Sequence, residues 1–217
     1  MNLEDKLQDL ERRWIGFLHR PLDCDEAREE KKLCAALEAA LRQEVKPLTD
    51  DLAGVGIHAD VWGLVNTSES YPEAIPVLVR HLSKPYHHRN KEGIVRALAV
   101  KEARGIANKT VVEQYRRLPK EDPSQPWIFH YRWAFGNTMS VIVTKDDLDD
   151  LIEIVSDTSN GESRTGFIDA LAKINSPKAI EVLRRLAKEK NRIVAERAKK
   201  MLVRNAKAQE KKSRASQ

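Results

Sequence analysis

The stretch KEGIVRALA, residues 91–99, returns without a gap as RTGFIDALA, residues 164–172. Both copies read as a basic residue, a glycine two positions later, two apolar residues, one variable residue and then Ala-Leu-Ala. The offset of 73 residues is about twice the length of a two-helix repeat, so a further hairpin should lie between the copies. The sequence therefore predicts a tandem array of helical hairpins.

Apolar periodicity supplies the helices of this array. An i, i+3, i+4, i+7 stripe, which marks one face of a helix, begins at Ile75, Leu148 and Ala179. A second apolar helix follows each stripe, and residues 111–118 and 127–143 supply the intervening hairpin. Four hairpins are thus predicted over residues 71–204, with suitable N-caps at Thr144 and Ser176.

The regions outside the array carry weaker patterns. Residues 1–70 are predicted to hold helices over 3–18 and 25–45 and a connecting segment, which together cap the exposed end of the array. Residues 46–66 are compatible with a loop, a short helix or an imperfect further hairpin. Residues 205–217 are polar and basic, and they are predicted to form a disordered tail.

Composition favours an all-α protein, since 33% of the residues are charged and only 6% are aromatic. Cys24 and Cys34 lack the Cys or His neighbours of a zinc site and are read as free thiols. The first residues contain no apolar run, so we expect a cytoplasmic protein with no membrane segment. The net charge of +5 divides into blocks of −6 (1–70), +7 (71–145), −7 (146–163) and +11 (164–217), unlike a uniformly basic nucleic-acid binder.

Tandem hairpins with a Pro at the helix start and Ala-Leu in the second helix resemble the HEAT-repeat superfamily. Residues 71–104 look like small bacterial HEAT-like proteins. The resemblance implies a right-handed α-solenoid that binds macromolecules on its concave face, and it brings no catalytic residue and no cofactor with it.

In such a stack the second helices usually line the inner surface. Positions opposite the core stripe of these helices are predicted to form a ladder of exposed groups. Two residues after the aligned apolar anchors stand Arg96, Asn137, Asp169 and Glu196, and two residues before the anchors stand Glu92, Trp133 and Thr165. Trp133 is the predicted centre of partner binding, because exposed indoles dominate measured hot spots. The alternative is that Trp133 packs against a neighbouring repeat.

Three basic residues occupy equivalent positions in successive hairpins, namely Lys91, Arg132 and Arg164. They are predicted to form a basic ridge for phosphates or acidic side chains. The alternative is that they are edge residues whose aliphatic stems cover the core.

Catalytic and metal motifs are missing from the sequence. It contains no Gly-rich phosphate loop, Gly-x-Ser-x-Gly elbow, His-Glu-x-x-His helix or Cys-x-x-Cys pair, so we expect no enzyme activity. His87 and His88 are adjacent, and chain neighbours usually point in different directions, so no metal site is predicted there. The acidic run from Asp146 to Asp150 lacks the Gly and Glu of a calcium loop.

Three functions remain open. The first is a non-catalytic scaffold or adaptor that binds a protein partner. The second is nucleic-acid binding, with HEAT-like DNA glycosylases as a comparison invited by Trp133 and Asp169. The third is an immunity or inhibitor protein for a toxin.

Overall fold

The computed structural model describes residues 2–18, 20–122 and 125–215, and within these ranges the chain consists of helices and turns with no strand. The α-helices are α1 (Leu3–Ile15), α2 (Cys24–Glu44), α3 (Lys46–Gly54), α4 (Val61–Asn66), α5 (Ala74–Leu82), α6 (His88–Ala97), α7 (Asn108–Arg116), α8 (Pro126–Ile142), α9 (Leu148–Ser156), α10 (Thr165–Ile174), α11 (Pro177–Leu186) and α12 (Arg192–Ala215). Three short 3-10 helices are η1 (Lys101–Ala103), η2 (Lys145–Asp147) and η3 (Thr158–Asn160). The predicted all-α class is confirmed.

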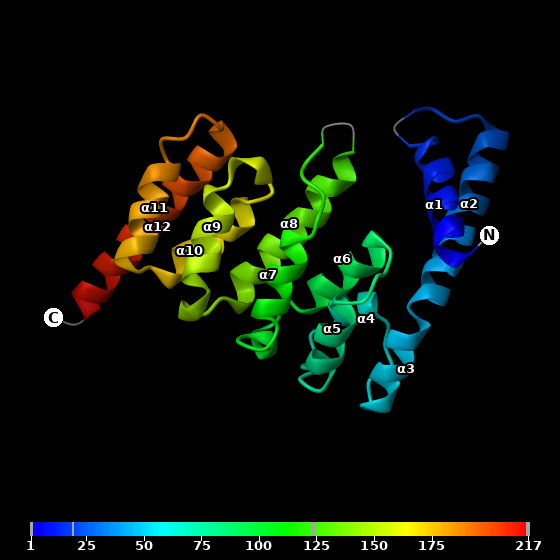
Figure 1. Ribbon diagram of the computed structural model, residues 1–217, viewed down its shortest axis with the longest axis horizontal. Coiled ribbons are helices and arrows are strands. Elements are labelled where there is room, and N and C mark those ends of the chain that lie inside the picture. Colours follow the sequence, from blue (N-terminus) through cyan, green and yellow to red (C-terminus); the bar gives the residue numbers. More distant parts are fainter. Residues whose placement is uncertain (1, 19, 123–124, 216–217) are drawn as a thin grey trace.

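The helices follow one another in pairs along the molecule (Figure 1). Helices α5/α6, α7/α8, α9/α10 and α11/α12 pack as pairs, at the places where hairpins were predicted. The second helices contact one another in the order α4, α6, α8, α10 and α12. The first helices make fewer contacts, between α3 and α5, α5 and α7, and α9 and α11.

A continuous apolar core runs through these pairs from Val45 to Met201. The aligned anchors Ile94, Phe135 and Phe167 are completely buried in it. Because each large apolar side chain contributes about 1.5–3 kcal/mol when fully buried, this core dominates the stability of residues 45–204.

The repeated glycine has a packing reason. A Cβ atom on Gly166 of α10 would lie 2.5 Å from the carbonyl carbon of Gly136 in α8, so the two helix backbones cross in direct contact. A Cβ atom on Gly93 of α6 would lie 2.8 Å from a methyl carbon of Val61 in α4. The glycine therefore lets each of these second helices approach the preceding one closely.

The first 70 residues divide between two cores. Helices α1 and α2 pack on each other around a separate small core of Leu7, Leu10, Leu33, Leu37 and Ala40. After Val45 the chain continues as α3, with Pro47 in its first turn, and α3 and α4 join the main core. The open question over residues 46–66 thus resolves into two helices, which extend the stack rather than belong to the N-terminal hairpin.

The predicted disordered tail is wrong for residues 205–215, which continue α12; residues 216–217 lie outside the described part. Residues 192–215 contain no Pro or Gly and are rich in strong helix formers. Asn205 also donates a hydrogen bond of 2.9 Å to the carbonyl of Ala172 at the end of α10. Across the described residues we find no helix with both the length and the apolar character needed to span a bilayer.

Candidate binding groove

An open groove of about 380 Å³ lies across the second helices α8, α10 and α12. Residues four apart on a helix share one face, and the lining follows this spacing. The groove is lined by Trp133 and Asn137 of α8, Thr165, Gly166 and Asp169 of α10, and Ile193, Glu196, Arg197 and Lys200 of α12. The close crossing of α8 and α10 at Gly136 and Gly166 forms its floor.

Most of the predicted ladder residues line this groove, but Arg96 and Glu92 do not. Trp133, Asn137 and Asp169 all line it, as does Glu196. Arg96 reaches the same surface from α6, with its guanidinium carbon 5.9 Å from the centre of the Trp133 ring. The indole is partly exposed, so it is neither a core residue nor a fully free side chain.

Most charges in the groove are paired with an opposite charge. Arg96 donates two hydrogen bonds, of 2.7 and 2.8 Å, to Glu92. Asp169 accepts two hydrogen bonds from Arg197, one of them 2.6 Å, and this bonding raises the pKa of Arg197. Besides these pairs, the groove presents the indole of Trp133, the amide of Asn137, the apolar side chain of Ile193 and the exposed Lys200 to a ligand.

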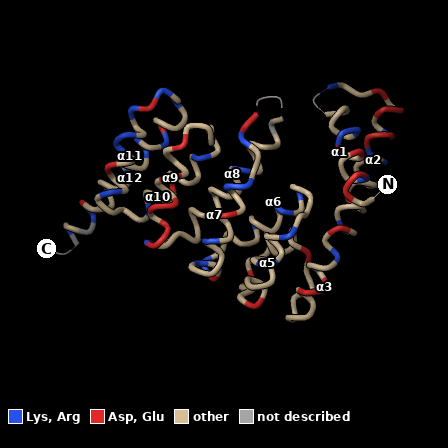
Figure 2. The backbone as a smooth tube through the Cα atoms, viewed as in Figure 1, with Lys and Arg blue, Asp and Glu red and all other residues tan. Residues whose placement is uncertain are grey.

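Acidic and basic positions are segregated along the fold. In Figure 2, basic positions gather at the α11–α12 end and acidic positions along α9. The charge blocks of the sequence therefore lie next to one another in the fold.

The predicted basic ridge is wrong for Arg132 and Arg164, because both side chains are only 1% exposed. Arg132 donates to the carbonyls of Leu118 and Pro119, which follow α7, and to Asn160 at 2.7 Å. Its guanidinium also lies 4.3 Å from the centre of the Tyr115 ring. Arg132 thus fixes the end of α7 against the loop before α10.

Arg164 has the same role one hairpin later. Its guanidinium donates to the carbonyl of Val155 at 2.8 Å and to that of Gly161, and it forms an ion pair with Glu189 after α11. Lys91 is half-buried and donates to Gln114 at 3.2 Å, and burial lowers its pKa. These cations hold hairpins together and are not available to phosphates.

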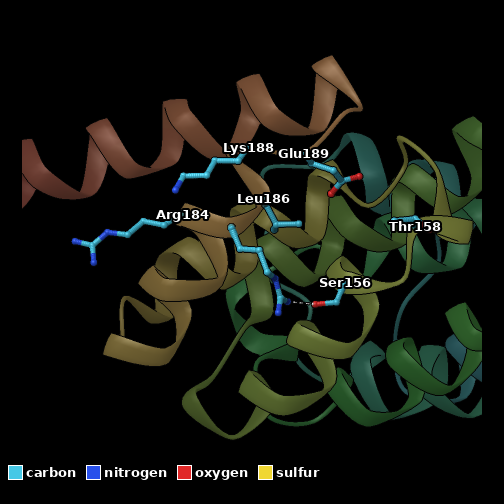
Figure 3. A pocket seen from close by; sticks show the side chains of 7 residues that line it. Ser156, Thr158, Arg184, Leu186, Lys188 and Glu189 are labelled. Atoms are coloured by element: carbon cyan, nitrogen blue, oxygen red, sulfur yellow. Dashed lines mark hydrogen bonds between the residues drawn. The ribbon is translucent and has the colours of Figure 1, made fainter.

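A second hollow of about 740 Å³ lies between α9 and α11 (Figure 3). Arg185 donates a hydrogen bond of 2.6 Å to Ser156 across it, whereas Arg184 and Lys188 extend outward into solvent. Glu189, also on its wall, is held by Arg164. The hollow is basic, but Arg184 and Lys188 are four residues apart at one end of α11 and point away from it into solvent.

His87 and His88 do not diverge as predicted. Both rings turn toward Glu11 of α1, and their centroids are 4.4 Å apart. Nothing in the sequence indicates this convergence, because Glu11 lies far from the two histidines along the chain. Among the described residues, these three form the one group of His, Cys, Asp or Glu side chains with donor atoms close enough to hold a metal ion.

No protein-family model matches this chain, and no curated protein or solved structure matches it either.

Proposed function

We propose that the chain is a right-handed α-solenoid of the HEAT type and acts as a non-catalytic scaffold or adaptor that binds a protein partner in the groove of α8, α10 and α12. The fold part of this proposal is supported by the unbroken order of contacts among the second helices. Such stacks present the second helices as an extended binding face.

The observation that carries the proposal is the partly exposed indole of Trp133 on the α8 side of a groove whose charges are largely paired. Protein interfaces combine a central aromatic or Arg anchor with a polar rim, and few residues supply most of the binding free energy. Trp133 is the anchor in this proposal, and Arg96, Asn137 and Asp169 form the rim.

Nucleic-acid binding is the weaker candidate. The three cations that would form a phosphate-binding ridge are engaged inside the fold, and the carboxylate of Asp169 is engaged by Arg197. Phosphate binding depends on free Lys and Arg side chains and weakens steeply with salt.

The test compares Trp133→Ala with Trp62→Ala in pull-downs from native lysate at low and physiological salt. Trp62 is 43% exposed on α4 and lies outside the groove, so Trp62→Ala is a control that removes an exposed indole elsewhere. We expect Trp133→Ala to lose the captured protein, Trp62→Ala to retain it, and salt to have little effect. Equal capture by both variants would contradict the groove as the binding site.

A parallel titration with labelled duplex and single-stranded DNA and RNA separates the two functions. We expect no tight binding. Tight binding that falls steeply with salt and is unaffected by Trp133→Ala would replace the protein-binding proposal with a nucleic-acid one.

A further inference from the structure

The N-terminal hairpin meets the stack through polar side chains rather than through a shared apolar core. The small core of α1 and α2 and the main core are separate clusters. Between them, Glu11 of α1 faces His87, His88 and Arg89 at the start of α6. Polar groups at this depth need well-formed partners, so this junction has a defined geometry.

Three donor atoms converge at the junction. The Nε2 atom of His88 lies 2.8 Å from Oε2 of Glu11, and the Nε2 atom of His87 lies 3.3 Å from the same oxygen. The two imidazoles and the carboxylate are between 9% and 16% exposed, which shields them from solvent but leaves them reachable.

The convergence of two neighbouring histidines follows from the backbone. His87 is the N-cap of α6 with φ −52° and ψ 144°, and His88 is the first helical residue. The change from extended to helical backbone between them brings both rings to one side. Side chains on a continuous strand or helix would have diverged.

Neighbouring residues fix the orientation of the three groups. The ring of His88 stacks on Trp127 of α8 with centroids 4.1 Å apart. Arg89 donates a hydrogen bond of 2.9 Å to Oε1 of Glu11, while Nε2 of His88 lies 3.0 Å from Oε1 and 2.8 Å from Oε2. Such outer contacts, which hold ligands in place, are typical of metal sites.

The donor set matches zinc in type and spacing. Zinc takes imidazole nitrogen and carboxylate oxygen at about 2.0–2.1 Å, so two donors around a tetrahedral ion lie roughly 3.3 Å apart. The two imidazole-to-carboxylate separations, 2.8 and 3.3 Å, are close to that value, and all three donor atoms lie within 4.8 Å of one another. Imidazole donors disfavour calcium and magnesium, which prefer oxygen ligands.

We propose that Glu11, His87 and His88 form a binding site for one zinc ion, which fastens the α1–α2 hairpin to the start of α6. This proposal is independent of the groove at Trp133.

Zinc binding requires the proton of the His87 ring to change position. Nδ1 of His87 accepts a long hydrogen bond, 3.4 Å, from the amide of Arg89, so Nε2 carries the proton that points to Glu11. Coordination through Nε2 requires the neutral ring to carry its one proton on Nδ1 instead, by exchange through solvent, and this gives up the long contact.

The experiment is a calorimetric zinc titration of the tag-free, chelator-treated full chain at pH 7.5. We expect one zinc per chain, with binding weakened at least about tenfold in His88→Ala and in Glu11→Gln. His58→Ala removes an exposed histidine between α3 and α4, and Cys24→Ser/Cys34→Ser removes both thiols; both controls should keep wild-type affinity.

Hydrogen exchange supplies a second readout. Zinc should slow exchange in residues 3–44 and leave α8 and α10 unchanged, and circular dichroism should show that Glu11→Gln remains folded. Wild-type affinity no greater than that of folded Glu11→Gln, or binding abolished by the cysteine substitutions, would overturn the site. Zinc binding without slower exchange in residues 3–44 would overturn the fastening role.

Discussion

The N-terminal hairpin and the stack that follows it are stabilised in different ways. The hairpin of α1 and α2 has a core of five buried residues, all its own. The stack from α3 to α12 has one continuous core, reinforced by buried Arg132 and Arg164. Residues packed in one core unfold together, whereas a unit joined by polar contacts can open separately.

The junction between these regions consists of directional contacts. Asn90 of α6 donates a hydrogen bond of 3.0 Å to the carbonyl of Leu41 and one of 2.7 Å to the carboxylate of Glu44, and both acceptors belong to α2. Arg89 lies over the Trp14 ring, 4.4 Å from its centre. We infer that the hairpin opens at a lower free energy than the stack, while its docked position is precise.

Loss of a buried cation should have the largest effect on the stack. Arg164→Met leaves Glu189 and the carbonyl of Val155 without their partner. Breaking a buried ion pair costs 3–5 kcal/mol, and because Glu189 is partly exposed we expect about 3 kcal/mol in urea unfolding. Arg184→Met, at an exposed position of α11, should change stability by less than about 0.5 kcal/mol. Equal effects would show that Arg164 is not the buried link described above.

Closing the space between α8 and α10 should have the next largest effect. The methyl group of Gly166→Ala would meet the backbone of Gly136, which cannot move aside as a side chain can. We expect a loss of about 2 kcal/mol in urea unfolding. Gly54→Ala is the control, since a methyl group there meets no atom within 4 Å. An unchanged stability of Gly166→Ala would contradict the close crossing.

A cavity introduced into the small core of α1 and α2 should destabilise that hairpin and leave the stack unaffected. Leu37 is 1% exposed in the small core, and Leu37→Ala should lower the opening free energy of α1 and α2 by about 2 kcal/mol. Amide exchange in α8 and α10 should remain unchanged. If exchange in α8 and α10 accelerated equally, the two regions would be one cooperative unit.

The smallest expected effect concerns a polar contact between α3 and α5, which adds to their shared apolar packing. Asp51 of α3 accepts hydrogen bonds from His81 at 2.7 Å and Arg80 at 2.8 Å, and these lower its pKa from 3.8 to about 2. A lowered pKa in the folded state means that this stabilisation is present above pH 3.8 and is lost as the pH falls toward 2.

Asp51→Asn should therefore melt slightly below the wild type at pH 7, and the difference should shrink between pH 4 and pH 2. Asp50→Asn, which loses only an exposed pair with Lys46, is the matched control. A difference that is constant with pH would show that the Asp51 carboxylate does not supply the stabilisation.

The sequence predicted the helices of the stack well and the use of its polar residues poorly. The 73-residue repeat located the anchors around Ile94 and Phe167 because apolar spacing alone determines which helix face is buried. The same alignment predicted that Trp133, Asn137 and Asp169 share one surface, and in the structure all three line the groove.

What could not be predicted depends on contacts between distant segments. A basic residue beside a core stripe looks the same whether it is exposed or buried, and burial of Arg132 requires Asn160 from a later loop. The convergence of His87 and His88 requires Glu11 from α1 and an exact helix start. The helical tail, by contrast, could have been predicted from its helix-forming residues, and Asn205 adds a contact with the end of α10.

Native-state hydrogen exchange in increasing urea tests the central claim, that the hairpin and the stack are separately stabilised, most directly. Amides of α1 and α2 should exchange through an opening of lower free energy and smaller urea dependence than amides of α8 and α10. A single free energy shared by both regions at all urea concentrations would contradict the account.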